Sequence, residues 1–337
     1  MSDKPRIVIK VIGNVFAVGP SRTVVGSRYE FVYDRDCTDY DWLVVYDEMP
    51  CSGSGVFCNN FEQLRCPREH TILCTWEPVS IKSYSRDYTR QFGHLLTNRP
   101  REAEKHPGYH LGRGYFVWFV HDIGGSIPIE AKQRSLSVVC SLKCMRHTLH
   151  YRRYELIRRL SEMLPNMDWY GHGVRPLERK ESALVPYKYH IAVENHIGVH
   201  HWTEKFADAI LCECLPFYAG DPAIREIFPH DCYIPIPIDD PEAAADIIRS
   251  AIAADEYSRR RGAILEAKRL ILEKYNFWQQ VIDVIESVRS SESHVESDNA
   301  SRIYARRALR WRSLSALCED CCDRIRRSAG RFFRGVL

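Results

Sequence analysis

The sequence predicts an α/β protein of two domains, the second of which is doubly wound. The chain has 337 residues, enough for about two domains of ordinary size. Residues 42–46 and 71–76 are short runs that are apolar on both faces, which is typical of parallel strands covered by helices on each side. After residue 134, similar runs alternate with helical segments, which indicates a second sheet of the same kind.

The first domain is expected over residues 1–133, with a hinge near residues 122–135. Residues 6–12 are β-branched and alternating, and they predict the first strand rather than a secretory signal. Residues 115–120 form a further apolar run, although its aromatic side chains would also suit a loop.

The second domain is expected over residues 134–288. A polar linker over 289–301 and a basic amphipathic tail over 302–337 follow it. The predicted strands and extended segments are 134–140, 167–171, 189–193 and 232–238. The predicted helices are 148–163, 205–214, 241–254 and 257–275.

Composition excludes several classes of protein. Hydrophobic residues make up 45% and charged residues 27% of the chain, and no run of about 18 apolar residues indicates a membrane span. Thirteen cysteines without an export signal predict free thiols in a reducing cytosol. Cys318, Cys321 and Cys322 suit either half of a zinc site or small residues on a helix face, and no second ligand pair follows them.

The net charge of +3 is unevenly distributed. Residues 301–337 hold ten arginines against three acids, a net charge of +7, which leaves −4 for the rest of the chain. The mildly acidic net charge of residues 1–300 argues against broad nucleic-acid binding.

Residues 189–220 contain the densest group of candidate functional residues. A predicted strand ends at Glu194 and Asn195, and Thr203, Glu204 and Lys205 begin the next helix. Ligands of open α/β sheets bind beyond the carboxyl ends of strands. A lysine at a helix N-terminus opposes the helix dipole, so Lys205 indicates either a solvated side chain or a nearby anion such as a bound phosphate.

The motifs YKYHIAVEN (187–195) and WTEKF (202–206), followed by Leu215-Pro216 and Gly220, resemble the donor-binding signature of family-10 glycosyltransferases, the α-1,3/1,4-fucosyltransferases. This resemblance implies the GT-B fold, in which two Rossmann-like domains, acceptor-side and nucleotide-sugar-binding, face a cleft. It also implies inverting transfer of fucose from GDP-fucose to a hydroxyl of a glycan acceptor in surface polysaccharide or lipopolysaccharide synthesis. No metal or other cofactor is required for this chemistry.

The resemblance also implies roles for individual residues. Glu77, in a segment similar to that of the family's catalytic glutamate, would be the general base, although a capping or salt-bridged glutamate also fits. Arg152 and Lys205 would contact the diphosphate, and Arg153 replaces Arg152 if the alignment slips by one. Glu204 would bind ribose hydroxyls. Glu194 and Asn195 would line the sugar pocket, where Asn195 also suits a simple turn.

The chain departs from the family pattern beside the donor site. His196 stands where a small Ser or Thr is common, and His200, His201 and Trp202 precede the shared Thr203-Glu204-Lys205. The histidines suit a changed donor, a pocket lining, or a positive charge near the diphosphate, whereas adjacent histidines suit a metal site poorly. Trp202 and Thr203 are further candidates for this pocket.

The tail repeats apolar residues at helical spacing among its arginines, which predicts a membrane-surface anchor. We therefore expect a cytoplasmic protein held peripherally at the inner face of the cytoplasmic membrane, acting on a glycan or a lipid-linked oligosaccharide. A contact with a partner helix or with nucleic acid is the alternative for the tail. For the whole chain, the alternatives are the same fold with another donor, a sugar-nucleotide-binding protein without catalysis, or a membrane-bound interaction protein.

Overall fold

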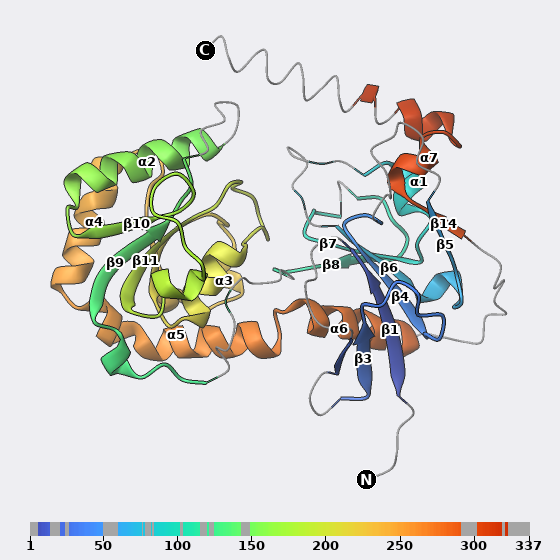
Figure 1. The fold of residues 1–337 in the computed structure, drawn as a ribbon, viewed down its shortest axis with the longest axis horizontal. Coiled ribbons are helices and arrows are strands. Elements are labelled where there is room, and N and C mark those ends of the chain that lie inside the picture. The colour runs from blue at the N-terminus through green and yellow to red at the C-terminus, as the bar shows by residue number, and fades with distance from the viewer. Residues whose placement is uncertain are drawn as a thin grey trace. The chain divides into compact units, whose positions relative to one another are not determined.

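The computed structural model describes residues 6–13, 21–23, 27–49, 60–75, 77, 82, 84–101, 104–114, 120, 125–142, 149–290, 302–318 and 321–322. The chain divides into two compact units. The first comprises Met1–Gly112 with Trp278–Phe333, and the second Arg113–Phe277 with Arg334–Leu337. Each unit contains a largely parallel sheet with helices, which confirms the predicted α/β class (Figure 1).

The first unit is built on a seven-stranded sheet with the strand order β2-β3-β1-β4-β6-β7-β8. All neighbours are parallel except β2 and β3. The strands are β1 Ile7–Ile12, β2 Ser21–Thr23, β3 Tyr29–Val32, β4 Trp42–Tyr46, β6 Thr71–Thr75, β7 His94–Thr97 and β8 Tyr109–Leu111. The central strands β4 and β6 are buried along their whole length, as the runs apolar on both faces predict. The predicted run at 115–120 lies outside the described residues apart from Val120.

Helix α6 belongs to the first unit although it follows the second in the chain. It spans Phe277–Arg289, inside the range predicted for the second domain. Trp278 Nε1 donates to Tyr33 Oη over 2.6 Å, and Arg28 pairs with Glu286 at 3.0 Å. Buried side chains at helical spacing carry its apolar face: Phe277, Val281, Val284, Ile285 and Val288. That spacing is visible in the sequence and indicates the helix.

Residues 302–317 also pack on the first unit. Strand β14 (Arg302–Tyr304) pairs antiparallel with β5 (Phe61–Gln63), and the short helices α7 (Arg306–Leu309) and α1 (Arg86–Thr89) lie in contact. The core of this unit takes several small or apolar side chains from the segment: Ile303, Ala305, Ala308, Leu309 and Ala316. The first part of the expected basic tail is therefore a structural element. Residues 323–337 lie outside the described residues, so their amphipathic helix stays a prediction.

Removing residues 302–337 should destabilise the first unit, whereas removing only residues 323–337 should not. Loss of the buried Ile303 and Leu309 side chains alone costs at least about 3 kcal/mol. Thermal unfolding of chains ending after Ser301 and after Cys322 tests this, because the longer chain retains every contact described above. Equal unfolding temperatures for the two truncated chains would contradict the prediction.

The second unit contains a five-stranded parallel sheet with the order β10-β9-β11-β12-β13. The strands are β9 Arg134–Val139, β10 Met167–Tyr170, β11 Tyr187–Val193, β12 Leu215–Ala219 and β13 Ile234–Pro235. The α-helices are α2 Leu149–Met163, α3 Glu204–Leu211, α4 Pro241–Ala253 and α5 Glu256–Glu273. Among the described residues of this unit, 3-10 turns span Ile129–Ala131, Lys180–Ala183, Ile224–Glu226 and His230–Cys232. Helix α2 packs with α4, and α3 packs with α5. The elements predicted in this half of the chain are present within a few residues of their expected bounds.

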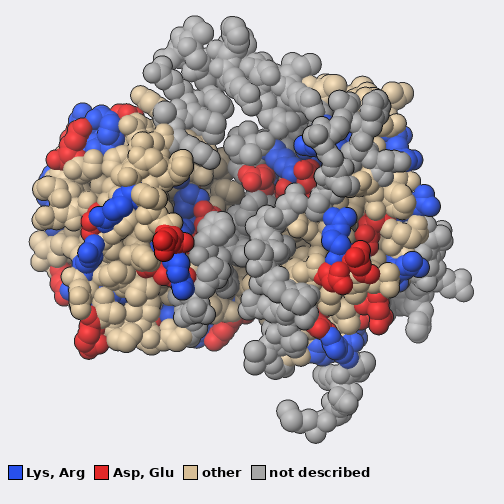
Figure 2. Space-filling model, viewed as in Figure 1, with Lys and Arg blue, Asp and Glu red and all other residues tan. Residues whose placement is uncertain are grey.

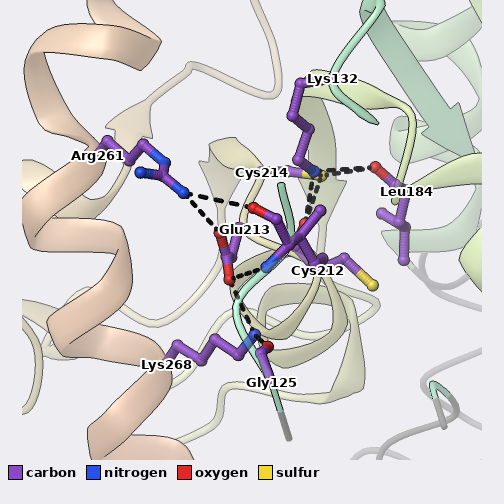
Figure 3. A network of polar contacts seen from close by, with 9 residues as sticks. Gly125, Lys132, Leu184, Cys212, Glu213, Cys214, Arg261 and Lys268 are labelled. Atoms are coloured by element: carbon purple, nitrogen blue, oxygen red, sulfur yellow. Dashed lines mark hydrogen bonds and ion pairs between the residues drawn. The ribbon is translucent and has the colours of Figure 1, made fainter. Parts of the chain in front are cut away.

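A buried charge network ties the chain entering the second unit to its helices (Figure 3). Glu213 is fully buried between α3 and β12, and its carboxylate accepts from Lys268 at 3.0 Å and from Arg261 at 3.4 Å. The same carboxylate accepts the Ile127 N–H at 2.8 Å, while buried Lys132 donates to the Cys212 carbonyl at 2.5 Å. Removing one partner of a buried ion pair typically costs about 3–5 kcal/mol. This network therefore holds the segment before β12 and residues 125–132 against helix α5, in the unit that contains the candidate site.

Candidate active site

The candidate site lies where β11 ends and α3 begins. The Glu194 N–H donates to the Ala219 carbonyl at 2.9 Å, so pairing with β12 continues one residue past the strand. Thr203 is the N-cap of α3, with an extended backbone, and its Oγ1 accepts from the Lys205 N–H at 3.3 Å. The sequence therefore correctly places the strand end and the helix start on either side of one loop.

Glu194 joins the two ends of this loop. Its carboxylate is completely buried and accepts from Thr203 N at 2.8 Å and from Thr203 Oγ1 at 2.6 Å, with Lys205 Nζ at 3.6 Å. Burial raises the pKa of Glu194, against the opposing charge of Lys205. A Cβ at Gly220 would lie 2.6 Å from Glu194 Cγ and 2.2 Å from Tyr218 Oη, so only glycine admits this close approach.

Lys205 is held by acidic neighbours at the first turn of α3. Its ammonium donates to Glu204 at 2.8 Å and to Thr203 Oγ1 at 3.1 Å. Burial disfavours the charge, but Glu194 and Glu204 outweigh it and raise the pKa of Lys205. Burial likewise opposes ionisation of Glu204, and Lys205 with Lys180 still lowers its pKa to about 2. The anion expected beside Lys205 is thus supplied by two carboxylates, and its position alone does not require a phosphate.

Lys205 borders a small pocket lined by residues of β9, β11 and α2. Two other cationic side chains line it, Arg153 and Lys180. Arg153 is 7% exposed, and its Nε has no hydrogen-bond partner within the described part of the chain. Lys180 pairs with the buried Asp208 at 2.5 Å. The pocket therefore offers positive charge at the carboxyl end of the sheet, where a ligand of an open α/β sheet binds.

The two adjacent arginines of α2 have different surroundings. Arg153 lines the pocket, whereas the Arg152 side chain is 47% exposed and donates to Asp239 at 2.6 Å. The structure therefore brings the alternative arginine to Lys205 and leaves Arg152 on the surface. Sequence reasoning missed Lys180, which precedes β11 in a 3-10 turn, because no spacing connects it to α3. Asn195 follows Glu194 at the end of β11 and does not line this pocket, and its buried Oδ1 has no partner among the described residues.

The loop with the histidines is buried at its end, at His201 and Trp202. His201 lies edge-on to His196 at a centroid distance of 5.1 Å, and Trp202 is 1% exposed against Phe206 and Phe228. Burial, with the charge of His196 and Lys205, lowers the pKa of His201 to about 3. His201 is therefore neutral near pH 7, which argues against its being a positive charge for a diphosphate. No group of three metal-ligating side chains occurs in the described residues.

Glu77 lies in the first unit, two residues after β6. It is partly buried, and its carbonyl accepts from Arg99 Nη2 at 2.9 Å. Arg99 is itself held by Glu104 at 2.8 Å. Glu77 thus follows the carboxyl end of β6, and its role as general base stays a prediction.

Comparison with known proteins identifies the class. Residues 129–257 match the model of glycosyltransferase family 10 (fucosyltransferase), C-terminal part. The structure is similar to a crystal structure of α1,3-fucosyltransferase with GDP, with a TM-score of 0.50 and 12% identity over 87% of this chain and 92% of that chain. A structure of α1,3-fucosyltransferase with GDP-fucose matches with a TM-score of 0.49 and 13% identity over 88% and 95% of the two chains. HepE of Anabaena with UDP-glucose matches with a TM-score of 0.44 and 9% identity over 67% and 73%. No curated protein matches the sequence.

The fold and the family match together define a glycosyltransferase of the GT-B class. Residues 129–257, which contain the pocket and the Glu194–Lys205 loop, match the C-terminal model of family 10, the fucosyltransferase family. The resemblance drawn from the two sequence motifs is therefore confirmed.

His201 should make stability depend on pH. Its folded pKa of about 3 lies below the ordinary value of 6.5, so between these values the unfolded chain binds a proton that the folded chain excludes. The free energy of unfolding should therefore fall on acidification. Between pH 7 and pH 5, His201→Gln should lose about 2 kcal/mol less than the wild type. Urea unfolding at both pH values measures this, with the exposed His172→Gln as control, and an unchanged loss in His201→Gln would contradict it.

Proposed function

We propose that the protein transfers fucose from GDP-fucose, with inversion, to a hydroxyl of a glycan acceptor. The observation that carries this proposal is the pocket lined by Arg153, Lys180 and Lys205. It lies beside the buried contacts of Glu194 with Thr203 and Lys205, within residues 129–257 that match the family-10 model. The solved α1,3-fucosyltransferase of the same fold is a complex with GDP, which supports a guanine nucleotide as the ligand.

Arg153 and Lys205 stabilise the leaving diphosphate. Negative charge grows on this group as the bond to the sugar breaks, and preorganised cations are effective there because they need not reorient. Arg153 Nε has no partner to give up within the described residues, and Lys205 can exchange a carboxylate for a phosphate oxygen. Each charge-assisted hydrogen bond contributes about 1.5–3 kcal/mol.

The remaining residues orient the donor. Glu204 is ionised at neutral pH, and its two oxygens suit the two hydroxyls of a ribose. Asn195 Oδ1 is a buried acceptor that lacks a partner among the described residues, which suits a hydroxyl of the transferred sugar. Glu194 acts indirectly, because its carboxylate is occupied by Thr203 and positions Lys205.

Glu77 is the proposed general base. The acceptor oxygen forms a bond to the anomeric carbon as the bond from that carbon to the diphosphate oxygen breaks, and the hydroxyl proton passes to the carboxylate of Glu77. Attack on the face opposite the leaving group inverts the anomeric centre. No metal takes part in this scheme, because cationic side chains balance the leaving charge.

Lys205→Ala should reduce kcat about 100-fold or more while the protein remains folded. The loss corresponds to about 3 kcal/mol of transition-state stabilisation. Fucose transfer or GDP-fucose hydrolysis measures the rate, and circular dichroism checks the fold. The exposed Arg158→Ala, on the surface of α2, should retain wild-type rates, and wild-type rates in Lys205→Ala would overturn the proposal.

The paired variants Arg152→Ala and Arg153→Ala test which arginine serves the pocket. Because Arg153 lines the pocket and Arg152 pairs with Asp239, Arg153→Ala should lose at least tenfold in kcat/KM and Arg152→Ala much less. Steady-state kinetics with GDP-fucose measures both. A larger loss in Arg152→Ala would return the diphosphate contact to that residue.

A second candidate keeps the fold and the reaction but uses another sugar nucleotide. The buried His201 and Trp202 beside the site favour it, because they depart from the family pattern where the donor is expected. Hydrolysis and thermal-shift assays across a panel of nucleotide sugars separate the two candidates. Binding without any hydrolysis or transfer would instead indicate a sugar-nucleotide-binding protein.

The C-terminal residues are proposed to hold the enzyme at an anionic, cytoplasmic membrane surface where a lipid-linked acceptor is elongated. Residues 323–337 contain five arginines and one aspartate, a net charge of +4, and each basic residue near such a surface contributes about 1 kcal/mol. Within the described residues, no helix has the length and apolar content of a membrane span. On the face shown in Figure 2, the described basic side chains are interspersed with acidic ones, which does not favour a nucleic-acid partner.

Removal of residues 323–337 should shift the protein from the membrane fraction to the soluble fraction. The cut after Cys322 is the informative one, because a cut before Arg302 would also damage the first unit. Sedimentation with anionic vesicles measures binding, and neutral vesicles provide the control. Unchanged binding of the shortened chain would contradict the anchor.

A further inference from the structure

His190 is a buried histidine of the pocket with no part in the function proposed above. It lies in β11, is 3% exposed, and lines the pocket together with Lys180 and Lys205. Within the motif YKYHIAVEN, the sequence indicates only the carboxyl-terminal Glu194 and Asn195 as candidate site residues.

The hydrogen bonds of Ser137 determine which ring nitrogen of His190 has the proton. Ser137 Oγ donates its single hydrogen to the Ala183 carbonyl at 2.6 Å. The same Oγ lies 2.8 Å from His190 Nδ1 and must therefore accept, so Nδ1 is the protonated nitrogen. The other nitrogen, Nε2, then has a free lone pair, and none of the described side chains or backbone groups gives it a hydrogen bond.

The surroundings keep the ring neutral. His190 is buried in the sheet, and burial together with the charges of Lys180 and Lys132 lowers its pKa to about 3. A neutral imidazole in this tautomer only accepts at Nε2. Such an acceptor repels a phosphate oxygen and requires an N–H or O–H partner.

We propose that His190 Nε2 accepts a hydrogen bond from a sugar hydroxyl of the bound nucleotide sugar, adjacent to its diphosphate. The hydroxyl belongs either to the ribose or to the transferred sugar, both of which adjoin the diphosphate that the neighbouring cations attract. His190 is in this way a specificity residue of the donor site, and Ser137 is the positioning residue that fixes its tautomer. The inference rests on the proposed nucleotide-sugar function.

The variant His190→Asn tests the contact. Its amide can still donate to Ser137, but its shorter side chain withdraws the acceptor from the pocket. If the hydroxyl is that of ribose, binding of GDP and of GDP-fucose should weaken about tenfold, and 2′-deoxy- or 3′-deoxy-GDP should bind both proteins equally. If it is that of the transferred sugar, only GDP-fucose binding should weaken. Isothermal titration calorimetry measures these affinities.

Two outcomes separate this inference from the function on which it rests. Unchanged affinities in His190→Asn, together with a loss in Lys205→Ala, would overturn the role of His190 and leave the proposed function standing. Absence of binding of any nucleotide by the wild-type protein would overturn both.

A measurement on the wild-type chain covers the case in which the variant does not fold. Nitrogen-15 spectra of the histidine-labelled protein should show His190 with Nδ1 protonated and Nε2 bare, and nucleotide sugar should shift the Nε2 signal. Ser137→Ala should mix the tautomers in the same spectra and weaken binding without removing any group that touches the ligand. An Nε2 signal that is protonated, or unchanged by the nucleotide, would overturn the proposal.

Discussion

The site depends on one buried carboxylate. Glu194 accepts two hydrogen bonds from Thr203 and lies 3.6 Å from the Lys205 ammonium, so the end of β11, the N-cap of α3 and the first cation of the pocket are tied together. A buried charge is tolerated only when it is paired and hydrogen-bonded. Glu194 and Thr203 therefore position Lys205 through contacts that do not involve the histidines of the intervening loop.

The buried carboxylate of Glu194 also affects the protonation of the charged groups beside the pocket. Glu194 and Glu204 keep Lys205 protonated, and Lys205 in turn keeps Glu204 ionised. Arg153 comes from a different element, α2, and its Nε has no partner in the described residues. The pocket thus combines Lys205, which Glu194 and Glu204 compensate, with Arg153, whose Nε can donate to an arriving anion.

The sequence predicts this site well where a short segment contains all the information. Glu194, Thr203 and Lys205 lie within twelve residues, and capping chemistry together with the end of a buried strand fixes their order in space. It fails where the contact is distant along the chain, as with Lys180 and with β14 on β5. The choice between Arg152 and Arg153 required the rotation of α2, because one residue along a helix turns the side chain by about 100°.

The pairing of β14 with β5 has a consequence for how the chain is made. The N-terminus of a growing chain leaves the ribosome first, and domains generally fold as units as they emerge. The second unit can assemble as soon as α5 has left the exit tunnel. The first unit cannot close its core until Ile303 to Ala316 has emerged. During synthesis, the earlier half of this protein is therefore the later half to fold, and β5 lacks its partner β14 for most of that time.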